Sequence, residues 1–416
     1  MASDRPRRGA RDRTASSARS GSKLRPHRRR PRSRHSADHG VRCPRRRRSL
    51  ARRRESRCRT RRARPCCTVG TSRSPLCHWP IIAYNLPDSQ MPRAERNMTM
   101  PTRPRCLQPG DTIGLVSPSS PTSRPSDHIR IQEWADEQGF RLKFFPHAAD
   151  RATYLAGRDE DRAADLMSAF ADPDVDAVLT IRGGYGGWRV VPHLDFDVIR
   201  AHPKFFCGYS DTTALHIAMG NVADLTTFYG PAASSFIGRN RSAYSLRHFL
   251  SALTVPAPIG VIERDPDDPF TWAINSGVAE GPLRGGCLSL LVQSLGTPWE
   301  VDWDGCIVFA EDVGEEPYRI DGYLTQLKLA GKLDNIAGFV VGEHVSCGPR
   351  EFRPSYAYGT YSTEEVYQHY LAPLGVPVMV GLPCGHGKHL ATLPLGARAR
   401  LDADNLTLEI LEGATI

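Results

Sequence analysis

The alternation of short apolar runs with amphipathic helical stretches between residues 111 and 218 limits the possible folds most strongly. Asp111–Ser117 and Ala177–Ile181 have the composition of buried strands, and Asp159–Ala171 has apolar residues at helical spacing. Strands that alternate with helices are typical of a mostly parallel sheet with helices on both of its faces. The sequence therefore predicts an α/β fold with a doubly wound sheet in this part of the chain.

The stretch Lys204–Leu215 combines a short apolar strand, a sharp turn that carries a serine, and the first turn of a helix. Gly208 leaves room just before the bend, and Ser210 occupies its apex. A serine at this place lies at the carboxyl end of a strand and at the positive end of a helix dipole. Ser117–Pro121 and Arg182–Gly187 also follow predicted strands, so they should line the same edge of the sheet. We therefore expect Ser210 to be a catalytic nucleophile.

The charges divide the chain into two unlike parts. Residues 1–100 contain 28 Arg and one Lys against six acidic residues, whereas the remaining 316 residues contain 26 basic and 39 acidic ones. An Arg-, Ser- and Pro-rich tail without apolar periodicity cannot bury a core, so we expect it to be disordered. The tail is either an electrostatic arm for nucleic acid or lipid, or translated upstream sequence before a start at Met91, Met98 or Met100. The second interpretation is favoured, and the acidic body gives no indication of nucleic-acid binding.

No stretch of the sequence indicates export or membrane insertion. The basic runs are not followed by an apolar signal segment, and no window approaches the roughly 20 apolar residues of a membrane span. The six cysteines of the body are scattered without a C-x-x-C pair, as is typical of reduced thiols in cytosolic proteins. A cytoplasmic protein without a membrane partner is therefore expected.

A body of 316 residues is too long for most single hydrophobic cores, so two folded domains are expected. The patterns place an N-terminal α/β domain with the nucleophile at 101–255 and a C-terminal domain at 281–416. Between them, the Pro- and Asp-rich stretch 256–280 is predicted to be a linker or loop. Residues 1–100 form the separate tail, which need not belong to the native protein.

Two residues of the second domain could complete a catalytic site with Ser210. Glu311 follows the apolar strand Cys306–Ala310, where a carboxylate can orient a histidine, although ordinary polar capping also explains such a residue. His386 lies between two glycines on a tight loop, although a lone histidine is usually only a polar loop residue. Together the three give the nucleophile–acid–base order of α/β-hydrolases. Thr212 replaces the last glycine of G-x-S-x-G, so the turn differs from the lipase type.

The glycine-rich loop Arg182–Gly187 supplies candidates for an oxyanion hole. Gly183 and Gly184 can turn backbone N–H groups toward the serine, and the N–H of Asp211 is the second donor. The loop does not fit a dinucleotide site, because Gly184-Tyr185-Gly186 is not followed by the last glycine of G-x-G-x-x-G.

Cys384, His386 and His389 form a C-x-H-x-x-H cluster, which raises the alternative of a metal site. The chain has no H-E-x-x-H motif and no second Cys/His group at the spacing of a zinc finger. We therefore expect no bound metal ion.

Five motifs resemble those of the LD-carboxypeptidases in order and context, and the resemblance covers about Gly110 to Ile410. They are Tyr154-Leu155-Ala156-Gly157, Arg182-Gly183-Gly184-Tyr185-Gly186, Gly208-Tyr209-Ser210-Asp211, Phe309-Ala310-Glu311-Asp312 and Gly385-His386. The resemblance implies a flavodoxin- or Rossmann-like N-terminal domain that carries the serine, and a smaller β-rich C-terminal domain that supplies acid and base. It further implies a triad of Ser210, His386 and Glu311, no metal or organic cofactor, and a homodimer.

The resemblance leaves two activities open. Peptidase members of the family are cytosolic serine peptidases of cell-wall recycling, which remove the terminal D-alanine of muramyl tetrapeptides by cutting an L,D-amide. The immunity branch instead hydrolyses peptidyl or aminoacyl sulfamoyl-adenylates. Glu311–Asp321 resembles the peptidase branch, whereas Trp272 in the loop 256–272 keeps the immunity branch open. Cys287 stands where Asn commonly follows the glycine pair, so one polar contact near the second-domain cleft differs. A ligand-binding protein without catalysis is a third alternative, disfavoured because all three candidate catalytic residues are present.

Overall fold

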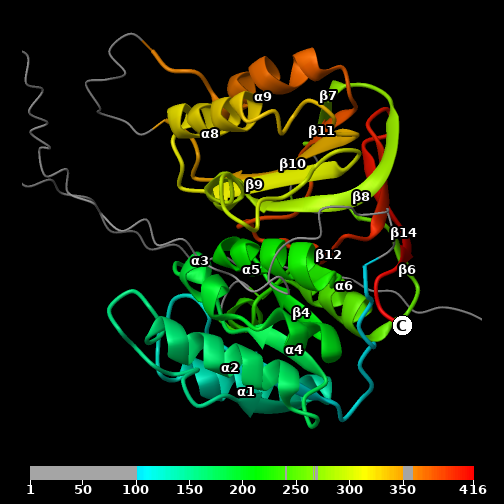
Figure 1. The fold of residues 1–416 in the computed structure, drawn as a ribbon. Coiled ribbons are helices and arrows are strands. Elements are labelled where there is room, and N and C mark those ends of the chain that lie inside the picture. The colour runs from blue at the N-terminus through cyan, green and yellow to red at the C-terminus, as the bar shows by residue number, and fades with distance from the viewer. Residues whose placement is uncertain (1–100, 239–240, 266, 268–269, 350–358) are drawn as a thin grey trace, which may run out of the picture. The chain divides into compact units, whose positions relative to one another are not determined.

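The computed structural model describes residues 101–238, 241–265, 267, 270–349 and 359–416 (Figure 1). All of them lie in one unit of the chain, Ile81–Ile416. The predictions for the tail, residues 1–100, lie outside the described residues.

Six strands form the first sheet, in the order β12-β5-β4-β3-β1-β2. The five strands from the N-terminal part run parallel, and β12 from the C-terminal part pairs antiparallel with β5. This arrangement confirms the predicted α/β fold with a parallel sheet. The strands are β1 (Thr112–Val116), β2 (Arg141–Phe144), β3 (Ala177–Thr180), β4 (Phe205–Gly208), β5 (Thr227–Tyr229) and β12 (Leu393–Leu395).

The side chains of β1 alternate between two hydrophobic cores, as the two-residue period of a strand requires. Ile113 and Leu115 lie in the core that also contains α1 and α6, whereas Val116 lies in the core with α2, α4 and α5. Helices therefore cover both faces of the sheet, which is the doubly wound arrangement. The helices of this part are α1 (Asp127–Gln138), α2 (Asp159–Ala171), α3 (Gly187–Val190), α4 (Phe196–Ala201), α5 (Thr213–Ala218) and α6 (Ala243–Thr254).

The second sheet has eight strands, in the order β6-β14-β13-β8-β9-β10-β11-β7. Its central strands β8 to β11 are parallel, and its outer pairs are antiparallel. The strands are β6 (Pro258–Val261), β7 (Trp272–Asn275), β8 (Val278–Cys287), β9 (Ile307–Val313), β10 (Gly338–Val345), β11 (Val378–Val380), β13 (Arg398–Asp402) and β14 (Thr407–Gly413). The helices are α7 (Leu288–Gln293), α8 (Pro317–Leu329) and α9 (Thr363–Leu371).

The stretch 256–280, which the composition predicts to be a linker or loop, differs from that prediction. It contains β6 and β7, and β8 begins at Val278. The first two are the edge strands of the second sheet, and an edge strand tolerates proline because part of its N–H groups need no partner. The domain limits at 255 and 281 stay a prediction.

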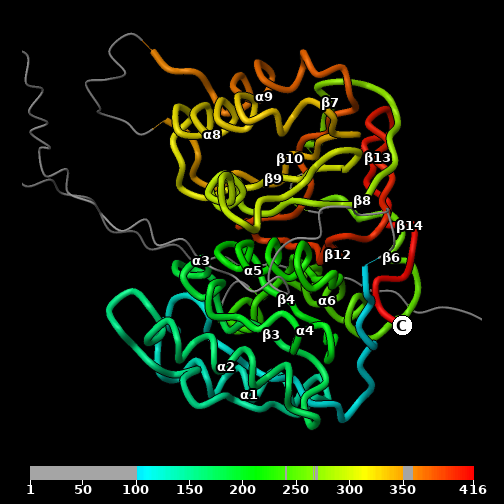
Figure 2. The backbone as a smooth tube through the Cα atoms, viewed as in Figure 1, coloured from blue at the N-terminus to red at the C-terminus, as the bar shows by residue number. Residues whose placement is uncertain are grey.

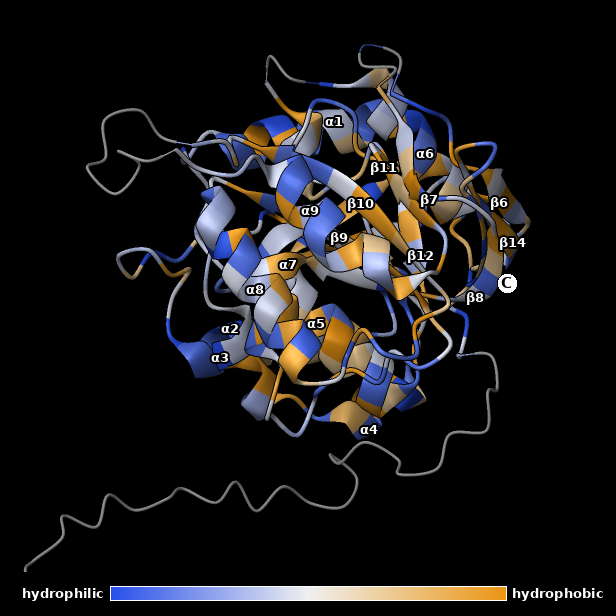
Figure 3. Cartoon of the chain, turned by 90° about the horizontal axis from the view of Figure 1, so that it is seen from above, coloured by the Kyte–Doolittle hydropathy of each residue, from blue (hydrophilic) through white to orange (hydrophobic). Residues whose placement is uncertain are grey.

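The two sheets are joined by a common core and by β12. All six residues of α5 are buried, and its hydrophobic residues, orange in Figure 3, share one hydrophobic core with α7 and α8. Leu393 of β12 pairs with Tyr229 of β5, so the chain returns to the first sheet after β11 (Figure 2). The loop 381–392 is therefore held by the second sheet at one end and by the first sheet at the other. Among the described helices, none is long and apolar enough to cross a membrane.

Candidate active site

Ser210 lies in the turn between β4 and α5, as the sequence predicts. Its φ is 63°, a left-handed conformation that costs a non-glycine residue about 1–3 kcal/mol. The surrounding structure holds it there, because Thr213 Oγ1 donates a hydrogen bond to the carbonyl oxygen of Ser210 (2.6 Å). Gly208 is required before the turn, since a Cβ at this position would lie 2.3 Å from Thr180 Oγ1. The serine is half-buried, and its strained backbone presents it at the carboxyl end of the parallel sheet.

Glu311 and His386 come together from β9 and from the loop between β11 and β12. His386 Nδ1 lies 2.7 Å from Glu311 Oε2, and the Glu311 side chain is completely buried. Burial lowers the pKa of His386, but the charge of Glu311 and its hydrogen bond outweigh that effect and raise it above the ordinary value. Gly385 allows this approach, because a Cβ there would lie 2.8 Å from Glu311 Oε2. The pair has the geometry of a histidine whose orientation is fixed by a carboxylate.

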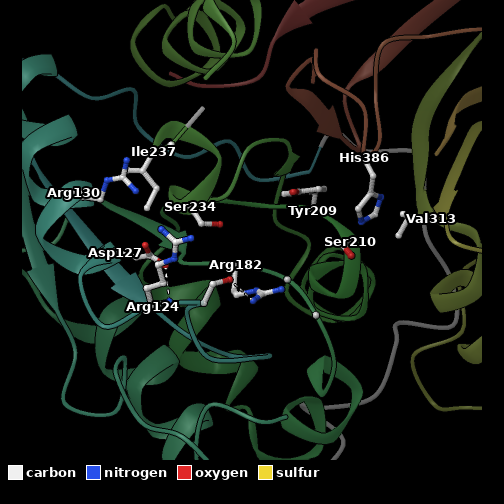
Figure 4. A pocket seen from close by; sticks show the side chains of 14 residues that line it. Arg124, Asp127, Arg130, Arg182, Tyr209, Ser210, Ser234, Ile237, Val313 and His386 are labelled. Carbon is white, nitrogen blue, oxygen red and sulfur yellow. Dashed lines mark hydrogen bonds between the residues drawn. The ribbon is translucent and has the colours of Figure 1, made fainter. Parts of the chain in front are cut away.

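Ser210 and His386 line one cavity of about 1080 Å³, together with Gly183 and Gly184 (Figure 4). The Tyr209 ring forms the wall next to the histidine, with its centroid 5.2 Å from that of the imidazole. The structure thus brings together residues that are 176 positions apart in the sequence, from β4 and from the loop before β12.

Tyr229, at the end of β5, connects the nucleophile turn with the carboxylate. Its hydroxyl accepts a hydrogen bond from the backbone N–H of Ser210 (3.0 Å) and donates one to Glu311 Oε1. Burial raises the pKa of Tyr229 well above its usual range, so the phenol remains a neutral donor. Nothing in the local sequence singles out this tyrosine, because the pattern of β5 does not show that its end lies beside the serine turn.

The glycine-rich loop lies directly against Ser210. A Cβ added at Gly183 would lie 2.9 Å from Ser210 Cβ and 3.3 Å from its Oγ. Gly184 has a φ of 121°, and a Cβ there would clash with Ser120 Oγ at 2.3 Å. Asp211 has a second role beside its predicted N–H: its buried carboxylate accepts the N–H of Gly187 (2.7 Å). The nucleophile turn and the glycine loop are therefore fastened to each other.

A buried arginine also holds the glycine-rich loop in place. Arg162 of α2 is 1% exposed, and its Nη1 donates to the carbonyl oxygens of Pro118 and Gly186 (3.1 Å for Gly186). Its other terminal nitrogen pairs with Asp159 in the same helix. The helical pattern predicted α2 correctly, but an arginine on its buried face gives no sequence signal of this positioning role.

The three residues of the alternative metal cluster contact different partners. His386 bonds Glu311, whereas His389 Nδ1 lies 2.8 Å from Ser242 Oγ and its Nε2 lies 3.0 Å from Asp267 Oδ2. Cys384 is buried, and burial raises the pKa of its thiol well above the usual range. In the part of the chain that the structure describes, no group of three or more His, Cys, Asp and Glu side chains is placed to hold a metal ion.

Glu343, on β10, contacts the loop 381–392, which carries His386. It accepts the N–H of Gly387 (3.0 Å), and a Cβ at Gly387 would lie 1.8 Å from its Oε1. Burial raises the pKa of Glu343 to about 7. This carboxylate was not predicted as a site residue, since β10 is far from His386 in sequence.

The α/β fold thus places a serine and a histidine on one cavity, and a buried glutamate contacts the histidine from behind the cavity wall. The chain matches the LD-carboxypeptidase N-terminal domain over residues 113–230 and the LD-carboxypeptidase C-terminal domain over residues 280–401. The chain therefore belongs to the LD-carboxypeptidase family, which confirms the resemblance seen in the motifs.

Similar proteins include members of both branches. A probable murein peptide carboxypeptidase of Bacillus subtilis is 36% identical over 319 residues, which cover 75% of this chain and 95% of that protein. The microcin C7 self-immunity protein of Escherichia coli is 29% identical over 335 residues, covering 74% and 94% of the two chains. The crystal structure of muramoyltetrapeptide carboxypeptidase from Oxalobacter formigenes has a TM-score of 0.62 at 32% identity, with 72% and 97% covered.

Proposed function

We propose that this chain is a serine LD-carboxypeptidase that removes the terminal D-alanine from muramyl tetrapeptides. The observation that carries the proposal is the 2.7 Å contact between His386 Nδ1 and Glu311 Oε2, beside a cavity that Ser210 also lines. Support for the substrate comes from relatives named murein peptide carboxypeptidase and muramoyltetrapeptide carboxypeptidase.

In the proposed reaction, His386 removes the proton from Ser210 as its Oγ attacks the carbonyl carbon of the L,D-amide. Glu311 holds Nδ1 in its protonated tautomer, which leaves Nε2 free to act as the base. The imidazolium then protonates the nitrogen of the leaving D-alanine, and the acyl-enzyme forms. Water, activated by the same histidine, hydrolyses the ester and restores Ser210.

The negative charge of the tetrahedral intermediate needs backbone donors on the glycine loop. We assign this role to the N–H groups of Gly184 and Asp211, with Gly183 as the residue that brings the loop against the serine. Loss of one such donor costs about 100- to 1000-fold in kcat in serine hydrolases. The contacts of Asp211 and Arg162 with this loop support the assignment, because preorganised donors need a rigid support.

The proposal extends to the setting of the enzyme. We propose a cytoplasmic homodimer that acts in peptidoglycan recycling on a small peptide, without a nucleic-acid or membrane partner. The division into an N-terminal domain at 101–255 and a C-terminal domain at 281–416 is part of this proposal.

The proposal is tested with the full chain, a muramyl tetrapeptide and an assay for free D-alanine. The native protein should release D-alanine, and Ser210→Ala should lose about 10⁴-fold or more of that activity while keeping its circular dichroism spectrum. Ser168→Ala, a change of the same size at an exposed position of α2, is the matched control and should keep full activity.

The similarity to the microcin C7 self-immunity protein supports a second candidate, a hydrolase of acyl sulfamoyl-adenylates. No D-alanine release together with turnover of such an adenylate would replace the first candidate by the second. Absence of turnover with both substrates would leave the non-catalytic binder.

A further inference from the structure

Three arginines line the same cavity as Ser210 and His386 (Figure 4). Arg124 lies three residues before the start of α1, Arg130 lies within α1, and Arg182 follows β3. Arg182 is half-buried, and the other two are exposed. Together they are named the arginine cluster. The mechanism proposed above makes no use of their charges.

The charges of the arginine cluster are not neutralised by nearby carboxylates. Within residues 101–238 and the other described ranges, none of the three guanidinium groups forms an ion pair; Arg182 instead donates to Pro121 O (3.3 Å) and Ser123 Oγ (3.1 Å). The carboxylate of Asp127 also lines the cavity, but it is buried and accepts the backbone N–H of Arg124 (2.9 Å). The cavity wall is therefore net positive, which attracts an anionic ligand.

Arg182 connects the positive cavity wall with the loop that lies against Ser210. Arg182 directly precedes Gly183, whose backbone lies against Ser210. In a substrate cut at its last peptide bond, the terminal carboxylate carbon is three bonds beyond the scissile carbonyl carbon, at most about 4 Å away. The guanidinium carbon of an extended arginine lies five bonds, about 6 Å, from its own Cα, which is long enough to reach this carboxylate. The planar fork of the guanidinium suits a carboxylate.

We propose that the arginine cluster is the site that recognises the free terminal carboxylate of the substrate. Arg182 binds the carboxylate directly, and Arg124 and Arg130 attract it through their exposed charges. The inference rests on the proposed function and extends it, because it explains why the enzyme would cut only the last residue of a peptide. An amide or a longer chain in place of the carboxylate would leave the Arg182 guanidinium without its anionic partner.

The test compares two substrates, a muramyl tetrapeptide with a free terminal carboxylate and the same peptide ending in D-alaninamide. For the full-length native chain, kcat/KM should favour the free acid. Arg182→Gln should lower this ratio by about 10- to 100-fold, the range for a hydrogen bond to a charged group, and Arg182→Lys should restore part of it. Arg124→Gln and Arg130→Gln should lower kcat/KM for the acid a few-fold, and this loss should vanish at high salt.

Arg398→Gln is the matched control, since Arg398 is an exposed arginine of β13 that pairs with Glu280 and does not line the cavity. It should leave the acid-to-amide ratio unchanged. A second readout is calorimetric binding of both peptides to Ser210→Ala, with and without Arg182→Gln, because it needs no turnover. Equal losses for acid and amide in Arg182→Gln, or equal binding of both peptides to Ser210→Ala, would overturn the inference. Preference for the acid in binding without any D-alanine release would refute the proposed function and keep the carboxylate site.

Discussion

The hydroxyl of Tyr229 offers the sharpest test of how the site is held together, and Tyr229→Phe removes that oxygen alone. The change leaves two groups without this partner, the part-buried N–H of Ser210 and the buried Oε1 of Glu311. Each unsatisfied buried group costs about 1–3 kcal/mol, so the free energy of unfolding should fall by about 2–6 kcal/mol. The nucleophile turn and the carboxylate also lose their connection, and a displacement of about 1 Å can cost about 100-fold in rate.

Two measurements follow this prediction, chemical denaturation for stability and D-alanine release for kcat/KM. Tyr367→Phe is the matched control, because Tyr367 is equally buried and its hydroxyl lies 2.6 Å from His344 Nε2 rather than at the site. Both variants should be less stable, but only Tyr229→Phe should lose activity at a temperature where both remain folded. Equal activity of the two variants would show that the link between Ser210 and Glu311 has no catalytic role. Unchanged stability of Tyr229→Phe would show that the hydroxyl does not satisfy these groups.

Three further predictions concern His386, Glu343 and Gly183. Because the pKa of His386 is raised and the proposed base must be neutral, kcat/KM should increase with pH through a midpoint above 6.5. Glu311→Gln should move that midpoint to a lower pH and should also lower the rate. A midpoint that stays in place would contradict the role of Glu311. The pKa of Glu343 is about 7 in the folded protein and 4.5 in the unfolded chain, so the folded state binds the proton more tightly. The stability that this proton contributes is complete below pH 4.5 and is lost as pH rises through 7. Glu343→Gln should remove that part of the pH dependence in denaturation experiments at pH 4 to 8. Gly183→Ala should lower kcat strongly, since its Cβ would lie 2.9 Å from Ser210 Cβ, whereas Gly322→Ala, at a position without a left-handed φ and with no atom within 4 Å of the added Cβ, tests the general cost of alanine at a glycine.

Local sequence patterns were sufficient to predict the elements that depend only on residues close together in the sequence. The periodicity of Asp159–Ala171 predicted α2 with its observed limits. The serine turn could also be placed, because a strand, a glycine and a helix start are all encoded within about ten residues. The predicted contact between Glu311 and His386 came from chain order and resemblance, and the structure places the two atoms 2.7 Å apart.

Contacts between distant segments could not be predicted in this way. The roles of Tyr229, Arg162 and Glu343 depend on which strands and loops lie beside them. The identity of a single strand residue does not indicate which residue lies next to it in the sheet. The edge strands β6 and β7 were predicted to be a linker, since proline and aspartate are rare in the strands of a sheet interior. β12 was missed because its three residues are too short to show an alternating pattern.

The return of β12 to the first sheet has a consequence for the order in which the protein can fold during synthesis. The parallel strands that carry Ser210 are translated early, but β5 keeps an unpaired edge until residues 393–395 have left the ribosome. His386 emerges only a few residues before them, on the loop that this pairing fastens. A nascent chain that has completed the serine turn therefore lacks both His386 and the last strand of the sheet. In the proposed mechanism, hydrolysis can begin only when nearly the whole polypeptide has been made, and until then the open edge of β5 is exposed to pairing with other chains.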